Sequence, residues 1–167
     1  DDLYIKPEDR IGLTGRNGYG KTSLLNHILK QLKIDPTDYC YLPQEINIAN
    51  AMLEIDKIKT LPGEILGKIM IIISRLGSRP ERILETKKPS PGEIRKILLA
   101  KGLSMTPYLI IMDEPTNHLD LPSIECLEDT LKSCDSSLFL ISHDFKFLNT
   151  LTNKKWNISS QNNKMLN

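Results

Sequence analysis

Residues 109–120 read Leu-Ile-Ile-Met-Asp-Glu-Pro-Thr-Asn-His-Leu-Asp, an apolar stretch that runs directly into two adjacent carboxylates. Short apolar runs bounded by polar residues are typical of a strand buried on both faces, as in a parallel sheet. Such a strand delivers Asp113 and Glu114 to its carboxyl end, the edge at which open α/β sheets bind ligands. The stretch therefore predicts an α/β fold with a polar site at one edge of the sheet.

A second informative stretch, residues 15–22, reads Gly-Arg-Asn-Gly-Tyr-Gly-Lys-Thr and matches the pattern G-x-x-x-x-G-K-[ST]. It lies between a predicted strand at Arg10–Leu13 and a predicted helix at Lys21–Leu32, the context that a phosphate-binding loop requires. Inward-turned backbone N–H groups, a helix N-terminus and the Lys21 ammonium all suit phosphate oxygens. A glycine-rich turn without a ligand is the alternative, and the Lys-Thr pair disfavours it. The predicted nucleotide-binding residues here are Gly15, Asn17, Gly18, Gly20, Lys21, Thr22 and Ser23.

Three side chains are candidate ligands for a magnesium ion that would accompany the phosphates. The Thr22 hydroxyl and the Asp113 carboxylate have the positions expected of such ligands. Gln44 follows a predicted strand at Tyr39–Leu42 and offers an amide oxygen, although a lone Gln after Pro is also an ordinary loop residue. Glu114, beside Asp113, is predicted to polarise the attacking water as a general base. The motifs together predict Mg²⁺-dependent hydrolysis of ATP.

His143 lies in Ile141-Ser142-His143-Asp144, at the end of another predicted strand, Leu138–Ile141. At that edge its ring can hydrogen-bond the γ-phosphate of a bound nucleotide. A purely structural histidine is the alternative interpretation.

Composition is that of an ordinary globular domain, with 40% hydrophobic and 26% charged residues in 167. The formal net charge of +1 argues against a strongly basic nucleic-acid-binding surface. The odd number of cysteines (Cys40, Cys126, Cys134) without metal-type spacing favours reduced thiols in a cytoplasmic protein. No apolar run approaches the ~20 residues needed to cross a bilayer.

The middle of the chain changes character and predicts a small helical subdomain at residues 46–104, inserted into an α/β core formed by residues 1–45 and 105–167. Helical spacing of apolar residues extends from Ile65 to Leu76, with Gly77 as the stop. Pro80–Glu85 is predicted as a short turn, and Pro91–Leu103 as a second helix. After the core resumes, helices are predicted at Pro122–Lys132 and Asp144–Leu151. Lys155–Ile158 is expected as a final edge strand, and the polar tail at 159–167 is expected to fray.

Ser90-Pro91-Gly92-Glu93 is typical of a helix start. Ser90 suits the N-cap, Pro91 the first helical position, and Glu93 completes a capping box. A capped helix N-terminus is also an anion site, so the same residues can face a phosphate on another chain. Both interpretations can hold together.

The ordered set of Gly15–Thr22, Leu42–Glu45, Ser90–Glu93, Leu109–Asp120 and Ser142–His143 resembles the nucleotide-binding domain of an ATP-binding-cassette (ABC) ATPase, a P-loop NTPase fold. Asp-Glu-Pro-Thr-Asn-His-Leu-Asp at residues 113–120 resembles the hallmark of the ABC-F class, ribosome-associated ATPases without membrane domains. The resemblance implies two domains closing head to tail over two ATP molecules, the second domain coming from the same polypeptide or from a homodimer.

In that pairing the resemblance assigns further roles. Ser90, Gly92 and Glu93 belong to the signature motif that completes the partner domain's nucleotide site. Asp120 makes a contact across the dimer, and His143 is the switch histidine. The ribosome is an expected partner, and no direct membrane contact is expected.

Three departures from the family pattern bear on activity. Pro91 lacks a backbone N–H, so the signature motif has one fewer donor for the partner's phosphate. Phe145 stands where the class usually has Arg. Only fourteen residues precede Gly15, so we expect the strand that carries the adenine-stacking aromatic to be missing and the core to be incomplete at its N-terminus.

Three functions remain open from the sequence. The first is an ABC-F-type ATPase domain acting in translation or in ribosome protection against antibiotics. The second is the ATP-binding subunit of a membrane transporter. The third is an inactive nucleotide-binding fragment, and for the isolated chain we expect weak turnover or none.

Overall fold

The computed structural model describes residues 4–86, 88–159 and 165–166. Within them, six strands form one sheet in the order β2-β3-β4-β1-β5-β6. The strands are β1 (Arg10–Gly15), β2 (Tyr39–Leu42), β3 (Leu109–Asp113), β4 (Ser137–Ile141), β5 (Lys154–Ile158) and β6 (Met165–Leu166). β1 to β5 run parallel, and β6 pairs antiparallel with β5. The predicted α/β class is confirmed.

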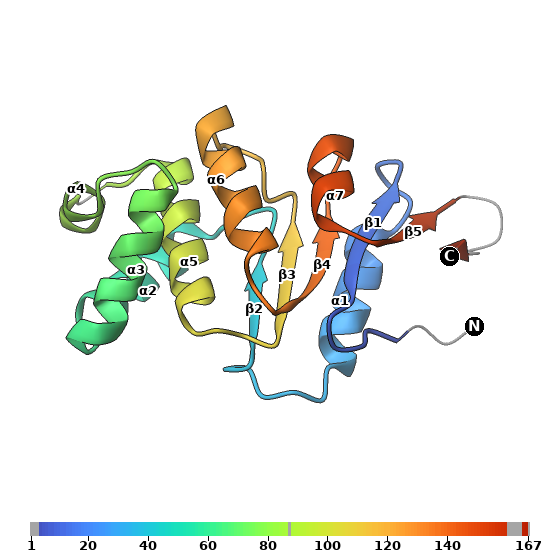
Figure 1. Cartoon of the computed structure of the whole chain (residues 1–167), viewed down its shortest axis with the longest axis horizontal. Helices are drawn as coiled ribbons and strands as arrows, with labels where there is room; N and C mark the ends of the chain where they lie inside the picture. The colour runs from blue at the N-terminus through green and yellow to red at the C-terminus, as the bar shows by residue number, and fades with distance from the viewer. Residues whose placement is uncertain (1–3, 87, 160–164, 167) are drawn as a thin grey trace.

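Helices cover both faces of this sheet (Figure 1). The helices are α1 (Lys21–Gln31), α2 (Ile48–Lys59), α3 (Gly63–Arg75), α4 (Pro80–Glu85), α5 (Pro91–Ser104), α6 (Leu121–Lys132) and α7 (Phe145–Leu151). α1 packs through Leu25 on the face that carries Ile11 and Ile141. α5, α6 and α7 pack on the opposite face, against Ile110 and Met112 of β3. Because both faces are covered, each residue of β3 is buried.

Four consecutive helices, α2 to α5, lie between β2 and β3, and three of them, α2, α3 and α5, share a separate apolar cluster. Its centre is formed by Ile55 on α2, Ile69 and Ile73 on α3, and Ile97 on α5, each at most 1% exposed. These helices fall within residues 46–104, where the inserted helical subdomain is expected. The assignment of that segment as a separate domain stays a prediction.

Several elements differ from the sequence-based expectation. Helix α2, whose N-cap is Asn47, was not predicted. β5 is not the edge strand, because β6 pairs beyond it. α7 begins at Phe145 with Asp144 as its N-cap, and α6 begins at Leu121. The expected fraying of residues 159–167 falls mostly on positions outside the described residues.

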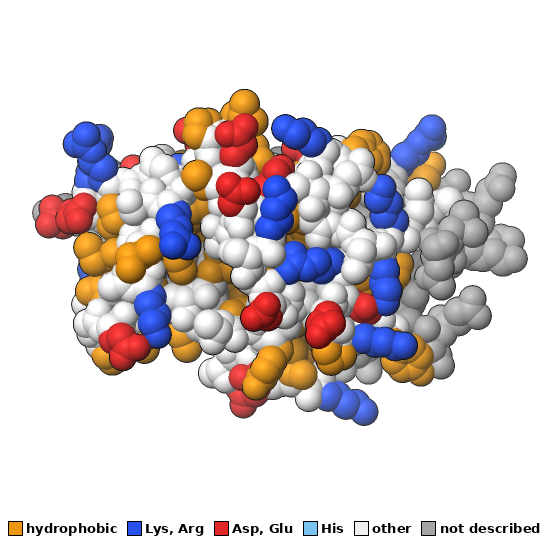
Figure 2. All heavy atoms as spheres, viewed as in Figure 1, with side chains coloured by type: hydrophobic (Ala, Val, Ile, Leu, Met, Phe, Trp, Pro, Cys, Tyr) orange, Lys and Arg blue, Asp and Glu red, His pale blue; other side chains and the backbone are white. Residues whose placement is uncertain are grey.

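Charged side chains of both signs are interspersed over the face in Figure 2, as the net charge of +1 leads one to expect. All three cysteines are free, in agreement with the prediction of reduced thiols. Among the described residues, no helix combines the length and the hydropathy needed to span a membrane.

Candidate active site

The carboxyl ends of four neighbouring strands enclose a cavity of about 480 Å³. The glycine loop after β1, Gln44 after β2, Asp113 and Glu114 at the end of β3, and His143 after β4 all reach it. Its lining residues are Asn17, Gly18, Gly20, Lys21, Thr22, Ser23, Gln44, Asp113, Glu114, Asn117 and His143. Side chains that are up to 126 residues apart in sequence thus share one space at the edge where α/β sheets bind ligands.

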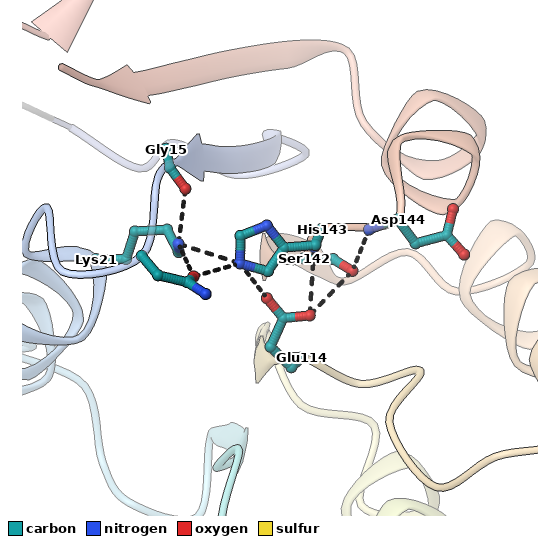
Figure 3. Close-up of polar contacts among 7 residues, drawn as sticks. Gly15, Lys21, Glu114, Ser142, His143 and Asp144 are labelled. Atoms are coloured by element: carbon teal, nitrogen blue, oxygen red, sulfur yellow. Dashed lines mark hydrogen bonds and ion pairs between the residues drawn. The ribbon is translucent and has the colours of Figure 1, made fainter.

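Lys21 and His143 face one another across this cavity (Figure 3). The Lys21 ammonium donates to the Gly15 carbonyl oxygen at 2.7 Å and lies 3.3 Å from His143 Nε2. The same ring nitrogen lies 2.8 Å from Asn17 Oδ1 and 3.5 Å from Glu114 Oε1. Four polar side chains from three strand ends therefore converge on one point, where a phosphate oxygen can accept hydrogen bonds from the Lys21 ammonium and from the His143 ring.

The loop geometry depends on glycine at two positions. Gly18 and Gly20 have φ of 81° and 93°, in the left-handed region that side chains with a Cβ disfavour. Gly20 is also the N-cap of α1, and its side-chain-free position leaves the first N–H groups of the helix open to an anion.

Hydrogen bonds hold Glu114 through one carboxylate oxygen, Oε2, while Oε1 lies 3.5 Å from His143 Nε2. Glu114 is 6% exposed, and its backbone adopts φ of 49°. Oε2 accepts from the His143 backbone N–H at 3.3 Å and from the Ser142 hydroxyl at 3.5 Å. Oε1 is buried without a hydrogen-bond donor among the described residues. Buried carboxylate oxygens are normally satisfied, so an open acceptor that faces a cavity is suited to a water molecule.

Asp113 lies next to Glu114 and is 5% exposed. Burial, reinforced by the negative charge of Glu114, raises the pKa of the Asp113 carboxyl, while Lys21 and Arg95 oppose the shift. Two adjacent carboxylates of this kind favour a bound cation, since a cation relieves both effects.

The donor set in the cavity fits Mg²⁺. The Thr22 hydroxyl, the Gln44 amide and the Asp113 carboxylate are hard oxygen ligands, and all three line the same space. Within the described residues, no group of three or more His, Cys, Asp and Glu side chains forms a metal cage. The set of one carboxylate, one amide and one hydroxyl suits Mg²⁺, which is commonly bound by one or two carboxylates together with substrate phosphates.

The other predicted nucleotide contacts lie outside the cavity. Ser90 is the N-cap of α5, and its hydroxyl accepts from the Glu93 N–H at 3.2 Å, while the Ser90 N–H donates to Glu93 at 2.7 Å. The capping box predicted from the sequence is therefore present. A Cβ on Gly92 would meet the His118 carbonyl oxygen at 2.7 Å, so the start of α5 packs directly on the loop after β3.

Asp120 also lies outside the cavity and contacts its own chain. Its side chain accepts a hydrogen bond from the Ser123 hydroxyl and lies 3.8 Å from Lys96 Nζ on α5. Hydrogen bonding to Ser123, and to a lesser extent the Lys96 charge, lowers the pKa of Asp120.

Three residues at the site carried no role in the sequence-based hypotheses. Asn117 lines the cavity, Ser142 donates to Glu114, and Arg95 contacts the main chain beneath it. Asn117 and Ser142 lie within motifs that were recognised, so their positions were a usable signal. Arg95 gave none, because a basic residue in a helix is mostly exposed to solvent.

Comparison with known proteins identifies the family. A family profile described as "ABC transporter" matches residues 1–117, more than half of the chain. The chain belongs to this family. It is an ABC ATPase nucleotide-binding domain, as the sequence motifs predicted, and domains of this family bind ATP with Mg²⁺ and hydrolyse it.

Curated relatives of this ABC domain include ABC-F proteins. It is 35% identical to the "Ribosome protection protein VmlR" of Bacillus subtilis, over 95% of this chain and 31% of the relative. It is 30% identical to the "ATP-binding protein Uup" of Escherichia coli, over 89% of this chain and 26% of that protein. The chain thus spans about a quarter to a third of the length of these relatives.

Solved structures share the fold of this ABC domain. An ATP-binding subunit of an ABC transporter superposes with a TM-score of 0.67 at 16% identity, over 90% of this chain and 75% of that one. An archaeal ribosome recycling factor superposes with a TM-score of 0.64 at 18% identity, over 92% of this chain and 32% of the other. At these identities, the similarity is evidence of the fold alone.

Proposed function

We propose that this chain binds ATP with Mg²⁺ and hydrolyses it as one member of a head-to-tail pair of ABC domains. The observation that carries the proposal is the single cavity that joins the glycine loop, Gln44, Asp113, Glu114 and His143. It supplies a cradle for phosphates, oxygen ligands for a hard cation and a carboxylate for water. Phosphoryl transfer needs these parts held together and little covalent chemistry from the protein.

Each side chain has a role that follows from its position. Lys21 exchanges the Gly15 carbonyl for a phosphate oxygen, and His143 Nε2 contacts the same phosphate. Glu114 Oε1 accepts from the attacking water, because Oε2 is already held by His143 N–H and Ser142. Thr22, Gln44 and Asp113 hold the Mg²⁺, which neutralises phosphate charge when it is bound.

Pairing is supported by the position of the signature residues. Ser90, Gly92 and Asp120 do not line the chain's own cavity, so a second domain would have to supply their equivalents. Isolated chains are then expected to turn over ATP weakly. The ATPase rate per chain should rise with chain concentration. A total ATPase rate that is simply proportional to chain concentration over the whole range would count against pairing.

The biological setting proposed is ABC-F-like, in the cytoplasm and on the ribosome. The support is the Asn117-His118-Leu119-Asp120 run together with relatives that include a ribosome protection protein. We expect more of the Glu114→Gln chain to cosediment with ribosomes when ATP is present than when ADP is present. The reason is that this variant would no longer hydrolyse the ATP and be released from the ribosome. Equal sedimentation with ATP, ADP and no nucleotide would reject this setting and leave the ATPase proposal standing.

A further inference from the structure

Arg95 is a charged side chain in the interior of the protein. It lies on α5, five residues after Ser90, and is 1% exposed. Burying a guanidinium is costly unless its donors and its charge are satisfied. The groups that satisfy the Arg95 guanidinium therefore indicate its role.

The Arg95 guanidinium bonds to main-chain carbonyls on both sides of the candidate metal site. Nη2 donates to the Gln44 carbonyl at 2.7 Å and to the Pro43 carbonyl at 3.4 Å. Nη1 donates to the Glu114 carbonyl at 3.3 Å. The two segments that it joins are 70 residues apart and carry two of the predicted site side chains, an amide and a carboxylate.

The positive charge has no direct carboxylate partner among the described residues, where no salt bridge involving Arg95 occurs within 4.0 Å. Asp113 and Glu114 nevertheless act on it through space. Its charge is thus compensated by carbonyl dipoles and by the same two carboxylates that a metal ion would meet. Asp113 and Glu114 line the cavity and Arg95 does not, so the carboxylate pair has a fixed cation near it that is not part of the cavity wall.

We propose that Arg95 is a positioning residue for the metal site, which holds the main chain of Gln44 and of Glu114 in register so that the Gln44 and Asp113 oxygens reach one ion together. This role rests on the proposed function. The planar fork of arginine suits it, because one side chain can donate to two separate strand ends at fixed angles. Residues that orient metal ligands without touching the metal typically change metal affinity by about 10–100-fold when they are replaced.

Arg10 provides a matched control. Its guanidinium likewise donates to main-chain carbonyls, those of Leu131 at 2.8 Å and Cys134 at 2.5 Å, but it lies at the amino end of β1. Arg10→Met and Arg95→Met each remove a side-chain bridge between distant segments. Both substitutions are expected to lower the melting temperature, and only Arg95→Met is expected to lower the affinity for Mg²⁺.

The test is isothermal titration calorimetry with ATP, once with Mg²⁺ and once with EDTA, on the wild-type chain, Arg95→Met, Arg95→Lys and Arg10→Met. The quantity compared is the ratio of the ATP dissociation constant in EDTA to that in Mg²⁺. We expect Arg95→Met to reduce this ratio roughly tenfold or more while ATP affinity in EDTA is retained. Arg10→Met should leave the ratio within about twofold, and Arg95→Lys should fall between, since lysine keeps the charge without the fork.

Equal ratios in wild type and Arg95→Met would overturn the inference, as would an equal loss of affinity in both conditions. If Arg95→Met does not fold by circular dichroism, Arg95→Lys decides, because an unchanged ratio there would overturn the role and a reduced one would support it. A wild-type chain that binds no ATP would refute the proposed function, and this role would fall with it. A wild-type chain that binds ATP with no effect of Mg²⁺ would refute the magnesium site of the proposed function, and the positioning role with it, while ATP binding would stand. A wild-type chain with a clear Mg²⁺ effect that Arg95→Met and Arg95→Lys leave unchanged would refute the positioning role alone.

Discussion

The two ends of the parallel sheet carry different cavities. The one at the amino ends of the strands has about 800 Å³ and is lined mainly by apolar side chains such as Leu32, Leu103 and Leu109. At the carboxyl ends, the candidate nucleotide cavity has about 480 Å³, and a neighbouring cavity beside Arg16 and Phe145 has about 730 Å³. Yet both buried side-chain atoms that lack a hydrogen-bond partner in the described residues, Arg95 Nε and Glu114 Oε1, belong to the carboxyl edge. Buried polar atoms without a hydrogen-bond partner, rather than cavity size, distinguish the edge that carries the candidate site.

The largest expected difference between the edges concerns turnover. Glu114→Gln removes the proposed general base and should reduce the ATPase rate by roughly 10²–10⁴, since a positioned base contributes about that much. Glu8→Gln is the matched change at the amino edge, where Glu8 lines the larger cavity. Steady-state phosphate release at a high chain concentration measures both. Comparable rates for Glu114→Gln and wild type would show that another group activates the water.

Nucleotide affinity should separate the edges by a smaller factor. Lys21→Ala removes a charge-assisted hydrogen bond to phosphate, worth about 1.5–3 kcal/mol, or roughly a tenfold to hundredfold loss in ATP affinity. Lys6→Ala removes a lysine that lines the amino-edge cavity and should leave affinity unchanged. Calorimetric titration of ATP into both variants provides the comparison. A matching loss in Lys6→Ala would mean that ATP is bound through general charge rather than at the glycine loop.

The packing of α5 on β2, between the two edges, should affect the stability of the fold without affecting ATP binding. A Cβ on Gly102 of α5 would lie 2.1 Å from Cys40 Sγ on β2. Gly102→Ala is therefore expected to lower the free energy of unfolding by about 1–3 kcal/mol through overpacking. Cys40→Ala combined with Gly102→Ala should recover part of this loss, because the clashing sulfur is gone. Urea denaturation gives both values, and an unaltered midpoint for Gly102→Ala alone would contradict this packing.

The smallest effect is expected in the helical segment, away from both edges. Glu54 on α2 accepts hydrogen bonds from Lys101 on α5 and from Lys57, and these bonds lower the pKa of Glu54 to about 2. A lowered pKa stabilises the fold above the ordinary value of 4.5, and this contribution disappears as pH falls toward 2. Glu54→Gln should cost at most about 1 kcal/mol at pH 7, since the pair is partly exposed.

The control for Glu54 is the pH dependence itself. The difference in melting temperature between wild type and Glu54→Gln should shrink as the pH is lowered through this window. A difference that stays constant down to pH 2 would mean that the ion pair contributes nothing to stability.

Much of this molecule was predictable because its motifs are local. The glycine loop, the strand before Asp113 and the capping box at Ser90 each depend on neighbouring residues, and the predicted bounds agree with the observed ones to within one or two residues. α2 was not predicted because its buried residues Ala51, Ile55 and Ile58 are mixed with the exposed Ile48 and Leu53. That mixture blurs the apolar face on which a helical pattern depends.

The contacts of Arg95 were beyond sequence reasoning for a different reason. They join α5 to a residue 51 positions earlier and to one 19 positions later. No periodicity within α5 distinguishes a basic side chain that enters the core from one that stays in solvent. Only the tertiary packing of α5 on the ends of β2 and β3 decides between them.

The cap of α5 has a consequence for how a second domain would be recognised. The bond from the Glu93 N–H uses a lone pair of the Ser90 oxygen and leaves the hydroxyl proton to be donated elsewhere. A phosphate oxygen on another chain would therefore be able to accept a hydrogen bond from this hydroxyl without unwinding the helix start. Pro91, whose ring already fixes φ near the helical value, adds rigidity at the same point. The start of α5 is thus ordered in the single chain, so association through it would cost less conformational entropy, which would partly offset the donor that proline lacks.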